Sequence, residues 1–142
     1  MFKFNQLENI QLEITSRCQA ACPMCERNNH GNLPNPNLIE NDWTLEDFKK
    51  IMSPSLLKQL RSICFCGNFG DPIINDDLIE MCKHAKSINN DIIITIHTNG
   101  GARKEEWWRE LASVLGDNSR VHIALDGLED THHLYRVNTT YN

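Results

Sequence analysis

The sequence contains no cluster of lysine and arginine, no long apolar run and no internal repeat. Its 142 residues carry 14 basic and 19 acidic side chains, which gives a formal net charge of −5. Because a nucleic-acid-binding protein usually presents a basic stripe, this balance predicts no nucleic-acid partner. No stretch approaches the roughly 18 apolar residues of a membrane span, and residues 1–6 lack the apolar core of a secretory signal. We therefore expect no membrane contact and a cytoplasmic protein.

Six cysteines occur in this sequence without an export signal. In that setting cysteines are reduced thiols or metal ligands more often than disulfides. A chain of this length can bury one hydrophobic core. We interpret residues 1–142 as a single domain.

Segments typical of strands and of helices alternate along the chain. Such alternation predicts an α/β fold, a parallel sheet of β/α units with right-handed crossovers. Residues 26–42 form a long polar loop, a length that is usually functional or mobile. Strands are predicted at residues 10–15, 62–66, 92–97 and 121–125, and helices after the N-cap Thr44, from Pro54, at residues 75–88 and 105–115, and from Glu129 onward.

Polar motifs directly follow each of the four predicted strands. In parallel sheets the functional groups gather at the carboxyl ends of the strands. We therefore expect the four motifs to share one site. They occupy residues 18–25, 67–72, 98–101 and 126–127.

Three cysteines, Cys18, Cys22 and Cys25, lie within eight residues on the loop that leaves the first strand. Three thiols in such a loop can converge on one cubane cluster. A [4Fe–4S] cluster normally takes four thiolates, so three leave one iron open to bind a substrate. Two alternatives stay open: a zinc site completed by His30, since structural zinc prefers four ligands, or three unligated thiols.

The C-x3-C-x2-C spacing and the flanking residues 12–28 resemble the signature of the radical S-adenosylmethionine (SAM) superfamily. The likeness is to the branch whose members often modify peptides or proteins and carry C-terminal auxiliary-cluster domains. It implies a [4Fe–4S] cluster on Cys18, Cys22 and Cys25 that cleaves SAM to a 5′-deoxyadenosyl radical, which abstracts hydrogen from substrate. It also implies a reducing partner such as flavodoxin or ferredoxin. Met24, which stands where many relatives have an aromatic residue, is expected to pack near the adenine.

Three further motifs resemble the SAM-binding segments of that family, although each is also ordinary turn chemistry. Residues 67–72 resemble the Gly-Gly-Glu-Pro motif, with Phe69 in place of a glycine and Asp71 in place of the glutamate. Ala124 lacks the hydroxyl that meets the SAM ribose in relatives, and Arg136 is expected on a solvated helix face. The residues predicted to bind the cofactor are Met24, Gly67, Asn68, Phe69, Gly70, Asp71, Thr98, Asn99 and Asp126.

The resemblance also sets the expected architecture. The family core is a partial (β/α)6 TIM-like barrel, and only four strands are visible in residues 1–142. We therefore expect an incomplete core whose C-terminal part is missing, from a truncated or split gene product. The resemblance implies a radical SAM enzyme acting on a peptide or protein, or on a small metabolite, and needs no protein nucleophile or base. The alternative is a non-catalytic iron–sulfur or zinc binding module, a remnant of such an enzyme.

Overall fold

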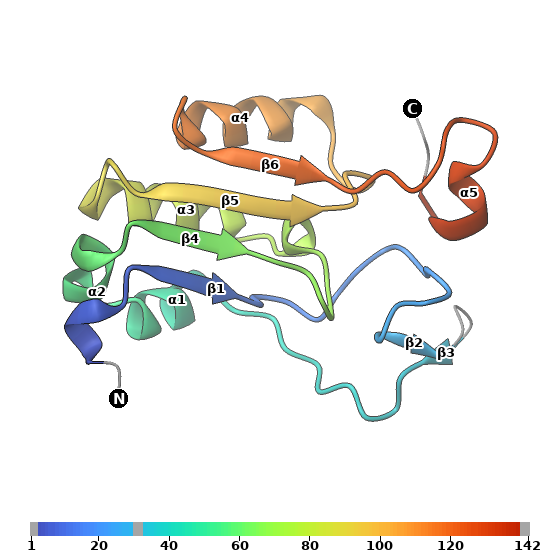
Figure 1. Cartoon of the computed structure of the whole chain (residues 1–142), viewed down its shortest axis with the longest axis horizontal. Helices are drawn as coiled ribbons and strands as arrows, with labels where there is room; N and C mark the ends of the chain where they lie inside the picture. Colours follow the sequence, from blue (N-terminus) through green and yellow to red (C-terminus); the bar gives the residue numbers. More distant parts are fainter. Residues whose placement is uncertain (1–2, 30–32, 140–142) are drawn as a thin grey trace.

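The computed structural model describes residues 3–29 and 33–139, which form a four-stranded sheet flanked by helices (Figure 1). All neighbouring strands of this sheet are parallel. The predicted fold class, α/β with a parallel sheet of β/α units, is therefore confirmed. Across the sheet the strands are β1 (Asn9–Leu12), β4 (Ser62–Phe65), β5 (Ile93–Thr98) and β6 (Arg120–Ile123).

Helices connect consecutive strands of the sheet. The chain also forms two 3-10 turns and a short antiparallel hairpin, β2–β3, that was not predicted and lies in the polar loop of residues 26–42. The helices are α1 (Leu45–Ile51), α2 (Pro54–Gln59), α3 (Leu78–Ile88), α4 (Glu105–Leu115) and α5 (His132–Tyr135); the turns are η1 (Phe4–Gln6) and η2 (Pro72–Ile74), and the hairpin strands are β2 (Asn28–Asn29) and β3 (Leu33–Pro34).

Local capping signals in the sequence fix the start of the first two helices. Thr44 Oγ1 accepts a hydrogen bond from the Asp47 amide at 3.2 Å, and the Asp47 carboxylate accepts one from the Thr44 amide at 2.9 Å. This reciprocal capping box satisfies two amides that the helix cannot pair internally. Pro54 occupies the first turn of α2, where its missing N–H costs nothing. Both predicted helix starts are confirmed.

One face of the sheet packs against the helices and forms the core. Ile63 and Phe65 of β4 and Ile94 and Ile96 of β5 are fully buried against apolar side chains of α3, such as Met81. Because side chains alternate along a strand, the residues between them point to the opposite face. That second face is mostly polar, and none of the helices among the described residues covers it (Figure 1).

Several element boundaries differ from the prediction: β6 ends at Ile123 rather than at residue 125, and α5 begins at His132 rather than at Glu129. For two others the contacts show the cause. The first strand ends at Leu12 rather than at residue 15, because the next residues pair with another segment: Trp43 N donates to Ile14 O at 2.8 Å. The helix expected from residue 75 begins at Leu78. There the Asn75 side chain is used to hold the loop, donating to Trp43 O at 2.8 Å and accepting from the Asp77 amide at 2.9 Å.

The helices are short. None of those formed by residues 3–29 and 33–139 has the length and apolar character needed to cross a membrane.

Candidate functional site

The carboxyl ends of β1 and β4 border a cavity of about 310 Å3 that all three candidate ligand cysteines line. Residues of the first three predicted motifs meet there, as the parallel topology predicts, whereas residues 126–127 of the fourth motif do not line this cavity. Eight predicted site residues line this cavity: Cys18, Cys22, Met24, Cys25, Gly67, Asn68, Gly70 and Asn99.

The cysteine loop is shaped by two tight turns. The Cys25 amide donates to Cys22 O at 3.1 Å, and the Asn28 amide donates to Cys25 O at 2.9 Å. Cys22 is buried, whereas Cys18 and Cys25 are partly exposed. Met24 lies on the rim of the cavity with 78% of its surface exposed. The loop therefore contributes three cysteines and an exposed methionine to the lining of one cavity.

A network of polar side chains reaches the Cys18 thiol. Asn99, which follows β5, donates from Nδ2 to the Cys18 sulfur at 3.5 Å, and Gln19 Nε2 donates to Asn99 Oδ1 at 2.6 Å. Burial raises the pKa of the Cys18 thiol to about 11, with the nearby Arg27 opposing the shift. A thiolate at this position therefore needs a cation or metal to stabilise it.

Arg136 reaches the buried cysteine from the end of the chain. Its Nη1 donates to the Cys22 sulfur at 3.7 Å, and its Nε pairs with the Asp126 carboxylate. Only 18% of the Arg136 side chain is exposed. The predicted position of Arg136 on a solvated helix face is therefore wrong, because the chain folds back: Ala21 N donates to Val137 O at 3.0 Å. Asp126 holds the arginine and does not line the cavity.

Two carboxylates hold the loop of residues 67–71, called the glycine loop below, in place. Glu13 accepts hydrogen bonds from the amides of Asn68 at 3.0 Å and Phe69 at 3.4 Å. Asp71 is buried and accepts from Thr98 Oγ1 at 2.9 Å and from the Asn99 amide at 2.8 Å. Burial raises the pKa of Asp71, although these hydrogen bonds oppose the shift.

These contacts give Asp71 and Thr98 a structural role. Both are buried, and Asp71 joins the loop after β4 to the loop after β5 instead of lining the cavity. Glu13 was not predicted as a site residue. The signal was present in the sequence, since Glu13 lies one residue beyond the end of β1 on the polar face of the strand.

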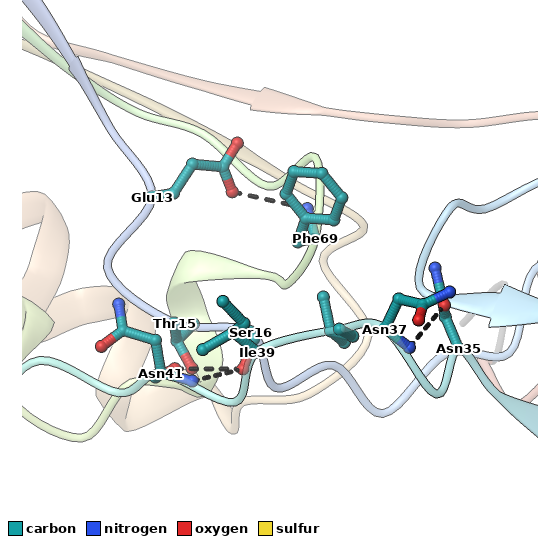
Figure 2. Close-up of a pocket in the computed structure, with 9 residues that line it drawn as sticks. Glu13, Thr15, Ser16, Asn35, Asn37, Ile39, Asn41 and Phe69 are labelled. Atoms are coloured by element: carbon teal, nitrogen blue, oxygen red, sulfur yellow. Dashed lines mark hydrogen bonds between the residues drawn. The ribbon is translucent and has the colours of Figure 1, made fainter.

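Phe69 belongs to a different hollow (Figure 2). This second cavity, of about 300 Å3, lies between the loop of residues 35–41 and the Phe69 ring. Its lining includes Ile39 and Asn37, and Figure 2 shows the Glu13 carboxylate reaching the Phe69 amide above it. Phe69 does not line the cavity of the three thiols.

The donor set suits a cluster with three protein ligands, because three cysteines line one cavity and iron–sulfur clusters are held by cysteine thiolates. Within residues 3–29 and 33–139, no three His, Cys, Asp or Glu side chains converge on a point that could hold a single metal ion. The three cysteines line the same cavity as Gly67 and Gly70, and its volume of about 310 Å3 leaves room for a group larger than a single ion. His30, the fourth ligand of the zinc alternative, lies outside the described residues.

The sequence of this chain is similar to those of known enzymes. A PqqA peptide cyclase of Bradyrhizobium diazoefficiens is 28% identical over 123 residues, which cover 85% of this chain and 29% of that protein. A probable GTP 3′,8-cyclase of Methanococcus aeolicus is 26% identical over 125 residues, 87% of this chain and 39% of that protein. The chain thus spans well under half the length of these curated relatives.

A solved structure shows the same fold. BtrN in complex with AdoMet and 2-DOIA superposes with a TM-score of 0.58 at 19% identity, over 89% of this chain and 50% of BtrN. The sheet of this chain therefore has the arrangement found in part of a TIM-like barrel. The family model described as "Radical SAM superfamily" matches residues 12–142. From the cysteine loop to the end of the sequence, this chain belongs to the radical SAM superfamily, whose members use a [4Fe–4S] cluster and S-adenosylmethionine.

Proposed function

We propose that this chain provides the cofactor-binding part of a radical SAM enzyme, as an incomplete core of four β/α units. The observation that carries the proposal is the shared cavity, which is lined by Cys18, Cys22 and Cys25 together with Gly67, Asn68 and Gly70 of the loop after β4. When bound and reduced, the cluster would supply the electron that cleaves SAM to a 5′-deoxyadenosyl radical.

Different residues of the chain would bind the cluster and the polar ligand. The three cysteines would hold the cluster, leaving one iron without a protein ligand. Asn68 and Asn99 line the same cavity; one N–H of Asn68 is bonded to Glu13 and one N–H of Asn99 to the Cys18 sulfur, and the second N–H of each amide would be available to a polar ligand.

The other residues predicted to bind the cofactor would hold the cysteine loop and the glycine loop in position. Gly70 allows the backbones of two loops to touch, and Met24 lies at the rim. Asp71 and Thr98 hold the loops together, and Asp126 directs Arg136 at the buried cysteine. Phe69 would contribute through the hydrogen bond that its backbone N–H donates to the Glu13 carboxylate rather than through its ring.

A peptide or protein is the proposed substrate class, with a small metabolite as the second choice. One of the relatives is named as a peptide cyclase, which supports the first, and another is named as a probable GTP cyclase, which supports the second. A flavodoxin or ferredoxin would supply the electron. The competing proposal is a binding module that takes up iron or zinc without cleaving SAM.

The test is anaerobic reconstitution of the chain with iron and sulfide, followed by dithionite and SAM, with 5′-deoxyadenosine measured by chromatography. The wild-type chain is expected to take up iron and to release 5′-deoxyadenosine, and Cys22→Ala is expected to lose both. Cys64→Ala is the matched control, because Cys64 lies on the sheet outside the thiol cavity. A formed cluster without cleavage would favour the binding module, and no iron uptake would refute both iron assignments.

A further inference from the structure

The face of the sheet that no helix covers is polar and faces outward. On β5 the buried Ile96 leaves His97 on this face, and on β6 the core-facing Val121 leaves Arg120 and His122 on it. His97 and His122 are both exposed. In a protein of net charge −5, this part of the surface presents only basic or neutral strand residues.

His97 and His122 are direct neighbours across two parallel strands. They are register partners between β5 and β6, and their ring centroids lie 4.7 Å apart with the planes tilted by 47°. Both rings line a pocket of about 200 Å3. Each ring can donate an N–H hydrogen bond, so two adjacent imidazoles offer two donors to one acceptor group placed between them.

Among the described residues that line the pocket, Arg136 is the one permanent ion, and the nearby carboxylates are engaged in other contacts. Arg136 lines the same pocket, and no Asp or Glu is among the described residues that line it. The Asp126 carboxylate pairs with Arg136 from outside the pocket. Glu13 is on the same face of the sheet, at its other edge, but it accepts hydrogen bonds from the Asn68 and Phe69 amides. The pocket is therefore suited to a ligand group of negative charge.

The pocket also adjoins the thiol cavity. Gly67 and Arg136 line both hollows, so a group held between the histidines would have the rest of its molecule beside the cysteine loop. We propose that His97, His122 and Arg136 form a subsite for an anionic group of the substrate, a carboxylate or a phosphate. Its assignment to a substrate rests on the proposed function above, whereas the binding of an anion does not.

The test uses the full chain before any iron is added. Sodium malonate and sodium phosphate are titrated in separate arms at constant ionic strength, with sodium chloride as reference, and the imidazole cross-peaks of His97 and His122 are followed by NMR. Saturable shifts of both rings with malonate or phosphate, absent with chloride, are expected. The anion that binds more tightly identifies the acidic group of the substrate.

Three variants test whether anion binding depends on the residues of this pocket. His97→Ala combined with His122→Ala is expected to weaken anion binding about tenfold or more, because both ring donors are lost. Binding to this variant is followed by the backbone amide cross-peak of Gly67, which lines the same pocket. His133→Ala, at an exposed position outside the pocket, is the matched control and should bind as the wild type does. Arg136→Gln should weaken binding while leaving the rings in place. Equal free energies of unfolding would show that all three variants are folded.

Two results would overturn the proposal. One is a set of shifts that does not saturate or that chloride reproduces. The other is SAM alone saturating the same two cross-peaks in competition with malonate, which would make the pocket part of the cofactor site. Because the titration precedes reconstitution, a failure to form a cluster or to cleave SAM would refute the proposed function without changing this result.

Discussion

Gly70 marks a point where two loop backbones touch, and replacing it by alanine tests how the site is assembled. A Cβ added at Gly70 would lie 2.8 Å from the Thr15 carbonyl carbon, 2.9 Å from the Arg17 carbonyl oxygen, and closer still to the Thr15 oxygen. The next amide, that of Asp71, donates to the same Arg17 oxygen at 2.8 Å. An alanine would therefore push the glycine loop away from the segment that leads to Cys18.

The size of the effect follows from these contacts. Forcing an extra methyl group into a packed site costs about 1–3 kcal/mol, and losing the Asp71–Arg17 hydrogen bond costs about 1 kcal/mol more. We expect Gly70→Ala to lower the free energy of unfolding by about 2–4 kcal/mol. At roughly 3 °C per kcal/mol for a chain of this length, the midpoint of thermal unfolding falls by about 6–12 °C.

The assay is thermal and urea unfolding of the purified chain, followed by circular dichroism. Gly116→Ala is the control, because Gly116 has a φ of +63° and no atom within 4 Å of an added Cβ. It therefore isolates backbone strain, which costs about 1–2 kcal/mol. The reasoning is refuted if Gly70→Ala is no less stable than Gly116→Ala, since that would mean that the two loops do not meet at this point.

Two further predictions concern the carboxylates that hold the glycine loop. Glu13→Ala should increase the hydrogen-exchange rates of the Asn68 and Phe69 amides about tenfold, because each loses its acceptor, with Glu13→Gln intermediate; unchanged exchange by NMR would contradict this. Asp71→Asn tests the raised pKa of Asp71. Because its folded pKa lies above its ordinary value of 3.8, the stability due to this carboxyl is present below that value and is lost as pH rises through the folded pKa. The difference in free energy of unfolding between wild type and Asp71→Asn should therefore shrink with rising pH in urea titrations, and a difference that grew with pH would refute it.

Much of the fold is readable in the sequence because its signals are local. The apolar run before His97 predicts a buried strand, and Thr44 with Asp47 predicts a helix start, since the residues that form each signal are within a few positions of one another. The same is true of the cysteine loop, whose spacing alone indicates a shared ligand. The alternation of strands and helices then predicts a parallel sheet with its motifs at one edge.

Boundaries were less predictable, because segments far apart in the chain compete for the same backbone groups. The pattern of residues 10–15 alternates to its end, but the strand stops at Leu12 where Ile14 pairs with Trp43. Likewise, the side chain of Asn75 is taken up by Trp43 and the Asp77 amide, so α3 begins later than its apolar pattern. Neither partner can be inferred from the residues next to it.

The sequence by itself determined the order of the elements, the cysteine loop and the edge of the sheet at which the motifs collect. Only the tertiary structure decided which side chains face the site: Glu13 holds a loop that lies 55 residues away, and Arg136 reaches a cysteine 114 residues away. It also brought His97 and His122 together as register partners. The physical reason is that periodicity fixes which face a residue occupies, whereas the partner on that face is chosen by strand register and chain crossings, which no local pattern encodes.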